Sequence, residues 1–264
     1  MRKLLLAAST VAALAAVDTA SAADLALKAP PAPAWYDWTG FYIGGNVGYS
    51  WGRTRTNYTV AGLAPFSTSQ SMNGALGGLQ AGYNWQFNRN WLFGLEADIQ
   101  GTGQRGTATL PTFVVTPPPA AVALPSTTST ATLAQKLPWF GTLRARLGIE
   151  PTDHWLLYIT GGLAYGEIKS TANVATSVAF GGGAVLATAA SSASANATRA
   201  GWTIGGGVEG VISGPWTAKI EYLYMDLGTF GNNFLGIGPT YPAIATSSHV
   251  TDNILRVGLN YHFH

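Results

Sequence analysis

Of the 264 residues, 14 are Lys or Arg and 12 are Asp or Glu, so the formal net charge is only +2. This balance leaves no basic field to hold nucleic acid and no acidic field to attract a cationic partner. The sequence contains no cysteine, which excludes thiol catalysis and every Cys-ligated metal site.

Charged residues are scarce although the sequence offers no helical membrane span. They make up 10% of the chain, against about a quarter in a typical soluble domain. After the N-terminal segment, no stretch approaches the roughly 20 consecutive apolar residues that a membrane helix needs. Charge depletion without such a stretch favours β-strands, and the 33 glycines fit strands that curve around a close-packed interior.

Residues 1–22 have the pattern of a secretory signal peptide. Two basic residues precede the apolar run 4–17, and the small residues 20–22 supply a cleavage site. Residues 23–38 contain several prolines and little periodicity, so we expect a Pro-rich periplasmic leader there. Residues 39–264 are then expected to form one domain.

Eight segments of this domain alternate between bulky apolar residues and small or polar ones, with the two-residue period of a strand. In chain order they cover 39–51, 74–87, 91–100, 139–149, 155–167, 201–212, 216–227 and 253–263. The facing of 155–167 is ambiguous, because Leu156, Leu157, Tyr158 and Ile159 are all bulky. A soluble sandwich would bury the apolar face, whereas a closed barrel in lipid turns that face outward and encloses the charges.

The connections between these segments alternate in length. Strands two and three, four and five, and six and seven are joined by about three to five residues, as in tight turns. The other connections cover about 53–73, 102–137, 168–200 and 228–252. Short periplasmic turns and long extracellular loops are the layout of an outer-membrane barrel. The sequence therefore predicts an all-β fold, a closed antiparallel eight-stranded transmembrane β-barrel with four long extracellular loops.

Two of the expected loops have a biased composition. Residues 107–137 are rich in Thr, Pro and Ala, and residues 171–198 in Ala, Ser, Thr and Gly. Both are almost uncharged and bury little apolar surface, so we expect them to be mobile.

Three tryptophans, Trp91, Trp155 and Trp216, each open the strand that follows a short turn. Amphipathic rings at one height form the aromatic girdle of a membrane–water boundary. The alternative is that the three rings belong to a hydrophobic core, but their common register beside the turns favours a girdle.

The inward-facing positions carry charges of balanced sign. The predicted lumenal ion-pair network consists of Glu96, Asp98, Arg144, Arg146, Glu209, Lys219, Glu221 and Arg256. Enclosed charges must be paired, because an isolated one costs several kcal/mol in a low-dielectric interior. We expect the network to fill the lumen, with a structural role favoured over ion conduction or gating. An eight-stranded barrel is only wide enough for side chains, which disfavours a wide pore.

The sequence offers few candidates for chemistry. The four histidines are His154 in a short turn, His249 in the last long loop, and His262 and His264 at the C-terminus. No catalytic His spacing, nucleophile elbow or phosphate-binding Gly loop is present. We expect no catalytic residues, no metal site and no cofactor, and His262 and His264 fit a solvated strand end better than a metal site. As the only loop histidine, His249 is the one candidate for a haem ligand.

Several segments resemble a known family. The stretch 38–49, Trp-Thr-Gly-Phe-Tyr-Ile-Gly-Gly-Asn-Val-Gly-Tyr, is similar to the opening strand of the RopB-like outer-membrane proteins, also called outer membrane immunogenic or porin-family proteins. Segments 161–166 (Gly-Gly-Leu-Ala-Tyr-Gly) and 256–261 (Arg-Val-Gly-Leu-Asn-Tyr) resemble later strands of that family. The resemblance covers nearly the whole mature chain, and it implies an eight-stranded barrel related to the OmpA-like transmembrane domain, abundant and exposed to host immunity. Such barrels typically end in an aromatic residue, whereas here His264 follows Phe263.

These observations favour a non-enzymatic, structural and surface-exposed barrel of a Gram-negative outer membrane. Its expected partners are outer-membrane lipid and lipopolysaccharide, and the assembly machinery that reads the C-terminal strand, but not nucleic acid. The alternatives are a narrow porin for small solutes, haem or adhesion ligand binding by the loops, a lipid-acting enzyme, and more distantly a soluble lipocalin-like carrier. A lipid-acting enzyme would need a His and a hydroxyl at the outer rim. The oligomeric state is left open.

Overall fold

A computed structural model of the chain describes residues 36–60, 64–116, 125–180, 184–234 and 244–263. All of them fall in the second of the chain's two units, Tyr36–His264. The predicted signal peptide and most of the predicted leader lie outside the described residues, as does His264. The described part contains no helix that is long and apolar enough to cross a membrane.

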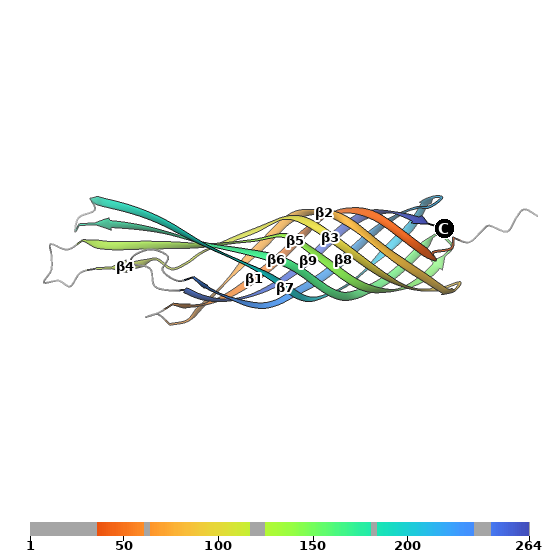
Figure 1. The fold of residues 1–264 in the computed structure, drawn as a ribbon, viewed down its shortest axis with the longest axis horizontal. Helices are drawn as coiled ribbons and strands as arrows, with labels where there is room; N and C mark the ends of the chain where they lie inside the picture. The colour runs from red at the N-terminus through yellow and green to blue at the C-terminus, as the bar shows by residue number, and fades with distance from the viewer. Residues whose placement is uncertain (1–35, 61–63, 117–124, 181–183, 235–243, 264) are drawn as a thin grey trace, which may run out of the picture. The chain divides into compact units, whose positions relative to one another are not determined.

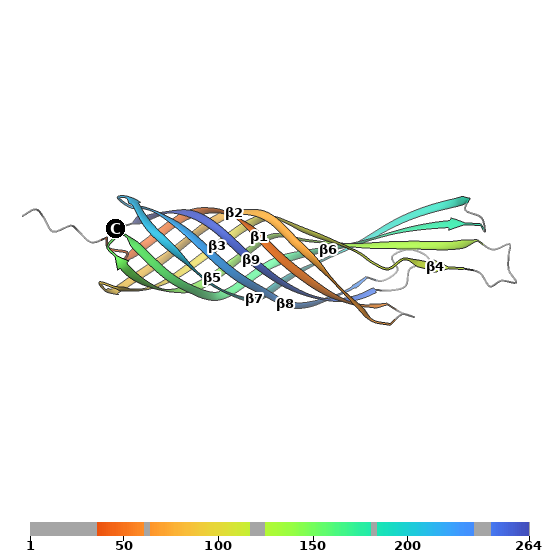
Figure 2. The same cartoon turned by 180° about the vertical axis from the view of Figure 1, so that it is seen from behind.

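Nine antiparallel strands form one sheet, which Figures 1 and 2 show from opposite sides. They are β1 (Gly40–Val60), β2 (Phe66–Asn88), β3 (Trp91–Thr109), β4 (Phe113–Val115), β5 (Ser126–Thr152), β6 (Trp155–Ala179), β7 (Val185–Ser213), β8 (Trp216–Phe234) and β9 (Ile244–Phe263).

The strand pairing runs in a ring. β1, β2 and β3 pair in order, β3 pairs with β5, the order continues to β9, and β9 pairs back with β1. β4 has three residues and pairs with residues near the start of β5. The predicted all-β antiparallel architecture is confirmed. The described chain has nine strands rather than the expected eight, because β4 adds a short partner to β5.

The short turns gather at one end of the ring. Residues 89–90, 153–154 and 214–215 separate strands there, and the start of β1 and the end of β9 lie at the same end (Figure 1). We call it the turn end, and the opposite one the far end.

The expectation of long irregular connections at the far end is wrong. β6 runs on to Ala179 and β7 begins at Val185, paired in register along the extension. Likewise, β5 begins at Ser126 inside the segment that was expected to be a mobile loop. Main-chain pairing does not require large buried side chains, so runs of Ala, Ser and Thr extend the sheet. Ala131, Leu133, Ala172 and Val174 on β5 and β6 are buried, whereas residues 185–192 of β7 are exposed on both faces. Figures 1 and 2 show this extension as a protruding sheet formed by β4, β5, β6 and β7.

Alternation along the strands places apolar side chains on the outer face. Leu79 is 69% exposed and Ile159 is 66% exposed. The ambiguous strand β6 is resolved, with Leu157 and Ile159 outward and Leu156 and Tyr158 buried inside. Because the outer face is apolar and the inner face carries the charges, the distribution is the reverse of that in a soluble sandwich.

The long extension of β7 has one unpaired edge. β7 pairs with β8 only from Trp202 to Ser213, whereas it pairs with β6 from Val185 to Gly210. Within the described residues, no strand pairs with the second edge of 185–201. This stretch contains no proline, and Arg199 is its only charged residue.

Candidate functional site

The strand register brings all eight predicted lumenal charges together. Direct cross-strand pairing places Glu96 opposite Arg144, Glu209 opposite Lys219, and Glu221 opposite Arg256. Each of the eight residues is between 0% and 5% exposed. The alternation predicted from the sequence thus assembles acids and bases from β3, β5, β7, β8 and β9 into one buried cluster.

Glu96 lies at the centre of this charge cluster. Its carboxylate is 2.9 Å from Lys219 Nζ and 3.5 Å from Arg256 Nη2, and it also pairs with Arg144. Asp98 Oδ2 lies 2.9 Å from both Arg144 Nη2 and Arg256 Nη2. Because Glu96 and Asp98 each contact at least two cations, no single pair neutralises either of them.

Two further acids complete the charge cluster. Glu221 accepts from Arg256 Nε at 2.6 Å and from Arg144 Nη1 at 3.1 Å. Glu209 accepts from Arg146 Nη1 at 3.1 Å. Charge-assisted contacts of this length are the strong class of hydrogen bond, so the interior is crossed by bonds that link opposite walls of the ring.

Two tyrosines that the sequence reasoning did not single out belong to the charge cluster. Tyr42 donates its hydroxyl to Glu96 at 2.6 Å, and Tyr158 donates to Glu221 at 3.0 Å. The Arg146 guanidinium lies over both rings, 4.6 Å from the Tyr42 centroid and 5.4 Å from the Tyr158 centroid. The alternation along β1 indicated that Tyr42 faces inward. The run of bulky residues in β6 left the facing of Tyr158 ambiguous.

The turn end of the interior is covered by aromatic side chains. Trp38 is fully buried and packs with Leu92, Leu156 and Tyr158. Trp38 Nε1 donates to Glu150 at 3.3 Å. Glu150 also accepts from Gln86 at 2.8 Å.

His262 was expected at a solvated strand end, and that expectation is wrong. The residue is 1% exposed, and its Nε2 lies 3.3 Å from Glu209 Oε1. Its ring stacks on Tyr42 with 5.3 Å between centroids and meets Trp38 edge-on at 5.6 Å. The aromatic cover over the turn end, which begins before β1, encloses a position that the sequence pattern alone leaves at the end of a strand.

An apolar layer follows the charge cluster toward the far end. It contains Met72, Leu76, Leu137, Phe140, Ala164, Ile168, Leu223, Met225, Leu227, Phe230, Val250 and Ile254, all buried. The interior is therefore layered along the length of the strands, with the aromatic cover, the ion pairs and a largely apolar layer, the apolar plug, in succession. Asp252 is buried within this last layer and accepts from Ser50 at 2.6 Å.

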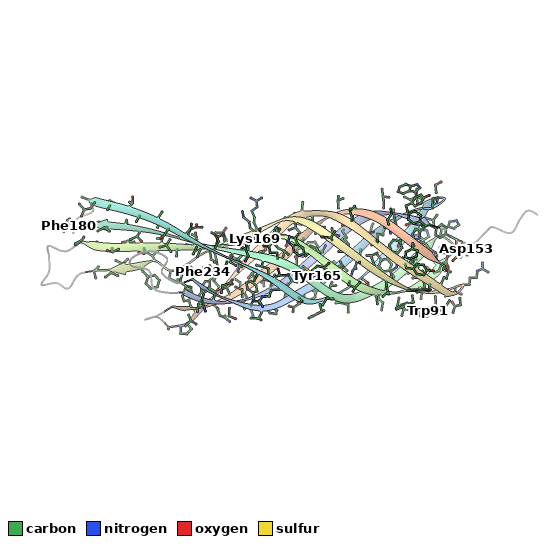
Figure 3. All side chains as sticks on the ribbon, in the orientation of Figure 1. Trp91, Asp153, Tyr165, Lys169, Phe180 and Phe234 are labelled. Carbon is green, nitrogen blue, oxygen red and sulfur yellow. The ribbon has the colours of Figure 1, made fainter. Side chains whose placement is uncertain are left out.

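The three predicted girdle tryptophans lie on the outer face at the turn end. Trp91, Trp155 and Trp216 are 44%, 54% and 48% exposed. Trp216 meets Tyr261 edge-on at 5.2 Å between centroids. Figure 3 shows Trp91 at this end, near Asp153 of a neighbouring turn. The three rings are thus surface residues rather than part of a core.

A second set of outward aromatic rings, missed by the sequence reasoning, lies toward the far end. It consists of three cross-strand pairs, which are Trp51–Tyr222, Trp139–Tyr165 and Trp202–Tyr224. We call the two sets the turn-end belt and the far-end belt. The outward residues between the belts carry no charge in the described part of the chain.

His249 lies within β9 rather than in a loop, which corrects the expected position of the haem-ligand candidate. Both ring nitrogens already have neighbours. Nδ1 lies 3.0 Å from Thr229 Oγ1, and Nε2 lies 3.4 Å from Asp226 Oδ2. Thr229 and His249 are direct cross-strand partners, so strand pairing alone accounts for the contact between them. A Ser-His-Asp triad directs Nε2 toward the nucleophile and Nδ1 toward the acid, which is the opposite of this arrangement.

Comparison with known sequences identifies the family. The family described as outer membrane protein beta-barrel domain matches residues 4–263. The chain belongs to this family. The resemblance to outer membrane immunogenic β-barrel proteins is therefore confirmed, and the protein is an outer-membrane barrel protein.

Its relatives carry names of the same kind. The barrel protein is 35% identical over 277 residues to the 31 kDa outer-membrane immunogenic protein of Brucella melitensis, with 100% of both chains covered. It is 25% identical to the 25 kDa outer-membrane immunogenic protein of Brucella abortus, with 93% of this chain and 91% of that protein covered. Among solved structures, the outer membrane protein OprG from Pseudomonas aeruginosa matches with a TM-score of 0.45 and 10% identity, covering 85% of this chain and 97% of that chain.

Proposed function

We propose that this protein is a closed, eight-stranded transmembrane barrel with a structural and surface-exposed role, and that its interior is sealed to solutes. The ring of eight long strands and the uncharged outer band between two aromatic belts support insertion in a bilayer. In this proposal the turn end faces the periplasm and the protruding sheet faces the outside.

The observation that carries the sealed interior is the charge cluster. Four acids and four bases from facing walls contact one another and are almost completely buried. An eight-stranded barrel has room for side chains and little else. Opening a path for solutes would require separating several buried ion pairs at once, and each uncompensated charge costs several kcal/mol.

Liposome swelling tests this function against the porin alternative. The refolded protein, with its barrel verified by a heat-dependent gel shift, is placed in liposomes and exposed to sugars of increasing size. We expect no swelling above that of protein-free liposomes. Swelling with a small sugar that a larger one fails to produce would establish a size-limited passage and contradict the sealed interior.

Neither chemistry nor haem binding is part of this proposal. The contacts of His249 with Thr229 and Asp226 support a role in strand pairing. If His249 nevertheless binds haem, then His249→Ala will reduce haemin affinity. We expect the affinity to be the same in both proteins, and a loss in the variant would restore the ligand hypothesis. Recognition of β9 by the outer-membrane assembly machinery stays a prediction.

A further inference from the structure

Five polar side chains lie in one line that crosses the outer face and starts beside Trp51 of the far-end belt. Cross-strand pairing joins each to the next, in the order Asn73 on β2, Arg105 on β3, Lys136 on β5, Lys169 on β6 and Asn196 on β7. All five are exposed. We call this line the cationic row, because its three central members are positively charged and its two ends are amides.

Without a bound anion, the like charges of the cationic row repel one another and destabilise the sheet. Adjacent strands are about 4.8 Å apart, and like charges directly opposite each other destabilise a sheet. Lys169 Nζ lies 3.6 Å from Glu167, which also accepts from Trp139 Nε1 at 3.1 Å. Among the described residues, Glu167 is the only acid that pairs with the row. Three cations against one acid leave a local excess of two positive charges.

The position of the cationic row corresponds to a lipid headgroup region. Lys169 follows Tyr165 of the far-end belt by four residues on β6, about 13 Å along a tilted strand. Figure 3 shows Lys169 beyond Tyr165 in the direction of the protruding sheet. Aromatic belts mark the boundary of the hydrocarbon region, and long cationic side chains keep their charged ends on the polar side of that boundary. The cationic row therefore lies in the headgroup region, where the anionic groups of lipids are found.

We propose that the cationic row binds the phosphate groups of a phosphorylated lipid in the outer leaflet. Arg105 supplies a planar guanidinium that can bind phosphate through two hydrogen bonds, and the two lysines supply compact charges. The amides of Asn73 and Asn196 add donors at either end. Bound phosphate removes the repulsion within the row, which explains how this arrangement is tolerated. This inference rests on the proposed insertion and orientation of the barrel.

The test compares two double variants that each remove two outward cations. Lys136→Gln with Lys169→Gln breaks the cationic row. Arg53→Gln with Arg55→Gln is the matched control, because the cross-strand partners of these arginines are Ser71, Thr251, Ser69 and His249. Each protein is melted in neutral maltoside micelles, in the same micelles with lipid A, and in micelles with the dephosphorylated lipid. A parallel sample receives inorganic phosphate in place of the lipid.

We expect the order of stability to reverse. In neutral micelles the row variant should melt above the wild type, because repulsion has been removed. With lipid A the wild type should melt higher, and the lipid affinity of the row variant should be about 30-fold weaker. The control should lose less than about threefold. Stabilisation of the wild type by inorganic phosphate alone would show a free-anion site and overturn the lipid proposal.

Other outcomes separate this inference from the proposed function. Equal losses in the two double variants would mean general attraction to anionic lipid and would overturn the cationic row as a site. Release of the wild type from phosphatidylcholine vesicles by an alkaline wash would overturn the transmembrane barrel itself, and the inference with it. If the wild type stays in the vesicles after that wash, but lipid A does not change which protein melts at the higher temperature, the inference alone is overturned.

Discussion

At the scale of single residues, the interior depends on pairing rather than on any one contact. Arg146 is fully enclosed between Glu209 and the rings of Tyr42 and Tyr158. Removing one partner of a buried pair leaves an uncompensated charge, whereas removing both leaves none. The consequence of a substitution here therefore depends on what remains behind.

Arg146→Met should destabilise the barrel by about 3–5 kcal/mol, because the carboxylate of Glu209 loses its guanidinium partner. The double variant Arg146→Met with Glu209→Gln should lose clearly less than the sum of the two single effects. Urea unfolding in phosphatidylcholine vesicles measures both. Arg89→Gln is the control, since Arg89 pairs with Asp153 at 3.5 Å on the surface and should cost less than about 1 kcal/mol. Additive effects of the two buried substitutions would contradict a coupled pair.

The sequence predicted these inward charges because strict alternation fixes the face of every residue in a strand. It did not predict the aromatic cover. Trp38 precedes β1, so no period assigns it a face, and His262 looks like the solvated end of a strand until that cover is placed over it. Contacts made by a segment outside the regular strands depend on the tertiary fold, and the local pattern does not contain them.

At the scale of elements, the far ends of the strands bend at irregular positions. The β8–β9 register shifts between Asp226 and Thr229. Gly228 lies in this bulge with φ +71° and donates its backbone N–H to Asp226 Oδ1 at 2.7 Å. An Asp side chain and a left-handed glycine thus form the bend together.

Gly228→Ala should cost about 1–2 kcal/mol, because an L residue is strained at that φ. No atom lies within 4 Å of the Cβ it would introduce, so the effect is one of backbone conformation alone. Gly45→Ala is the matched control. Its new Cβ would also be unhindered, with a nearest atom at 3.8 Å, and its φ is not in the left-handed region. Equal unfolding midpoints for the two variants would contradict the role of the bend.

The unpaired edge of β7 leads to a second prediction for an element. An uncharged edge strand without proline is a template for pairing with another strand. Two barrels on apposed membranes present this edge in antiparallel directions, so liposomes that contain the protein should cluster, as measured by light scattering. Ala190→Lys with Ser192→Lys should prevent clustering, whereas Asn173→Lys with Ala175→Lys, placed on β6, which pairs on both sides, should not. Equal clustering of both variants would exclude the β7 edge as the cause.

The extension of the strands also shows where prediction from the sequence ends. Residues 185–198 have small side chains on both faces, so they lack the alternation that reveals a strand. Their structure is set by main-chain pairing with β6. Composition suggested a mobile loop because it reports burial, and residues 185–192 extend the sheet without burying their side chains.

At the scale of the whole molecule, the barrel inverts the arrangement of a soluble protein. The outer band between the turn-end and far-end belts is apolar and uncharged, and the interior carries eight paired charges beneath an apolar plug. The cationic row begins at the far-end belt, where Asn73 pairs with Trp51. Contact with lipid explains this distribution, because a protein that exposed so many apolar residues to water would aggregate.

The most direct test of this central claim is site-specific labelling from the lipid phase. The natural chain has no cysteine, so each introduced cysteine is unique. Leu143 is 54% exposed on the outer face, and its neighbour Thr142 is 1% exposed inside. In proteoliposomes, Leu143→Cys should react with a bilayer-dissolved maleimide and Thr142→Cys should not. Reaction at Thr142→Cys with protection of Leu143→Cys would place the apolar face inside and contradict the membrane barrel.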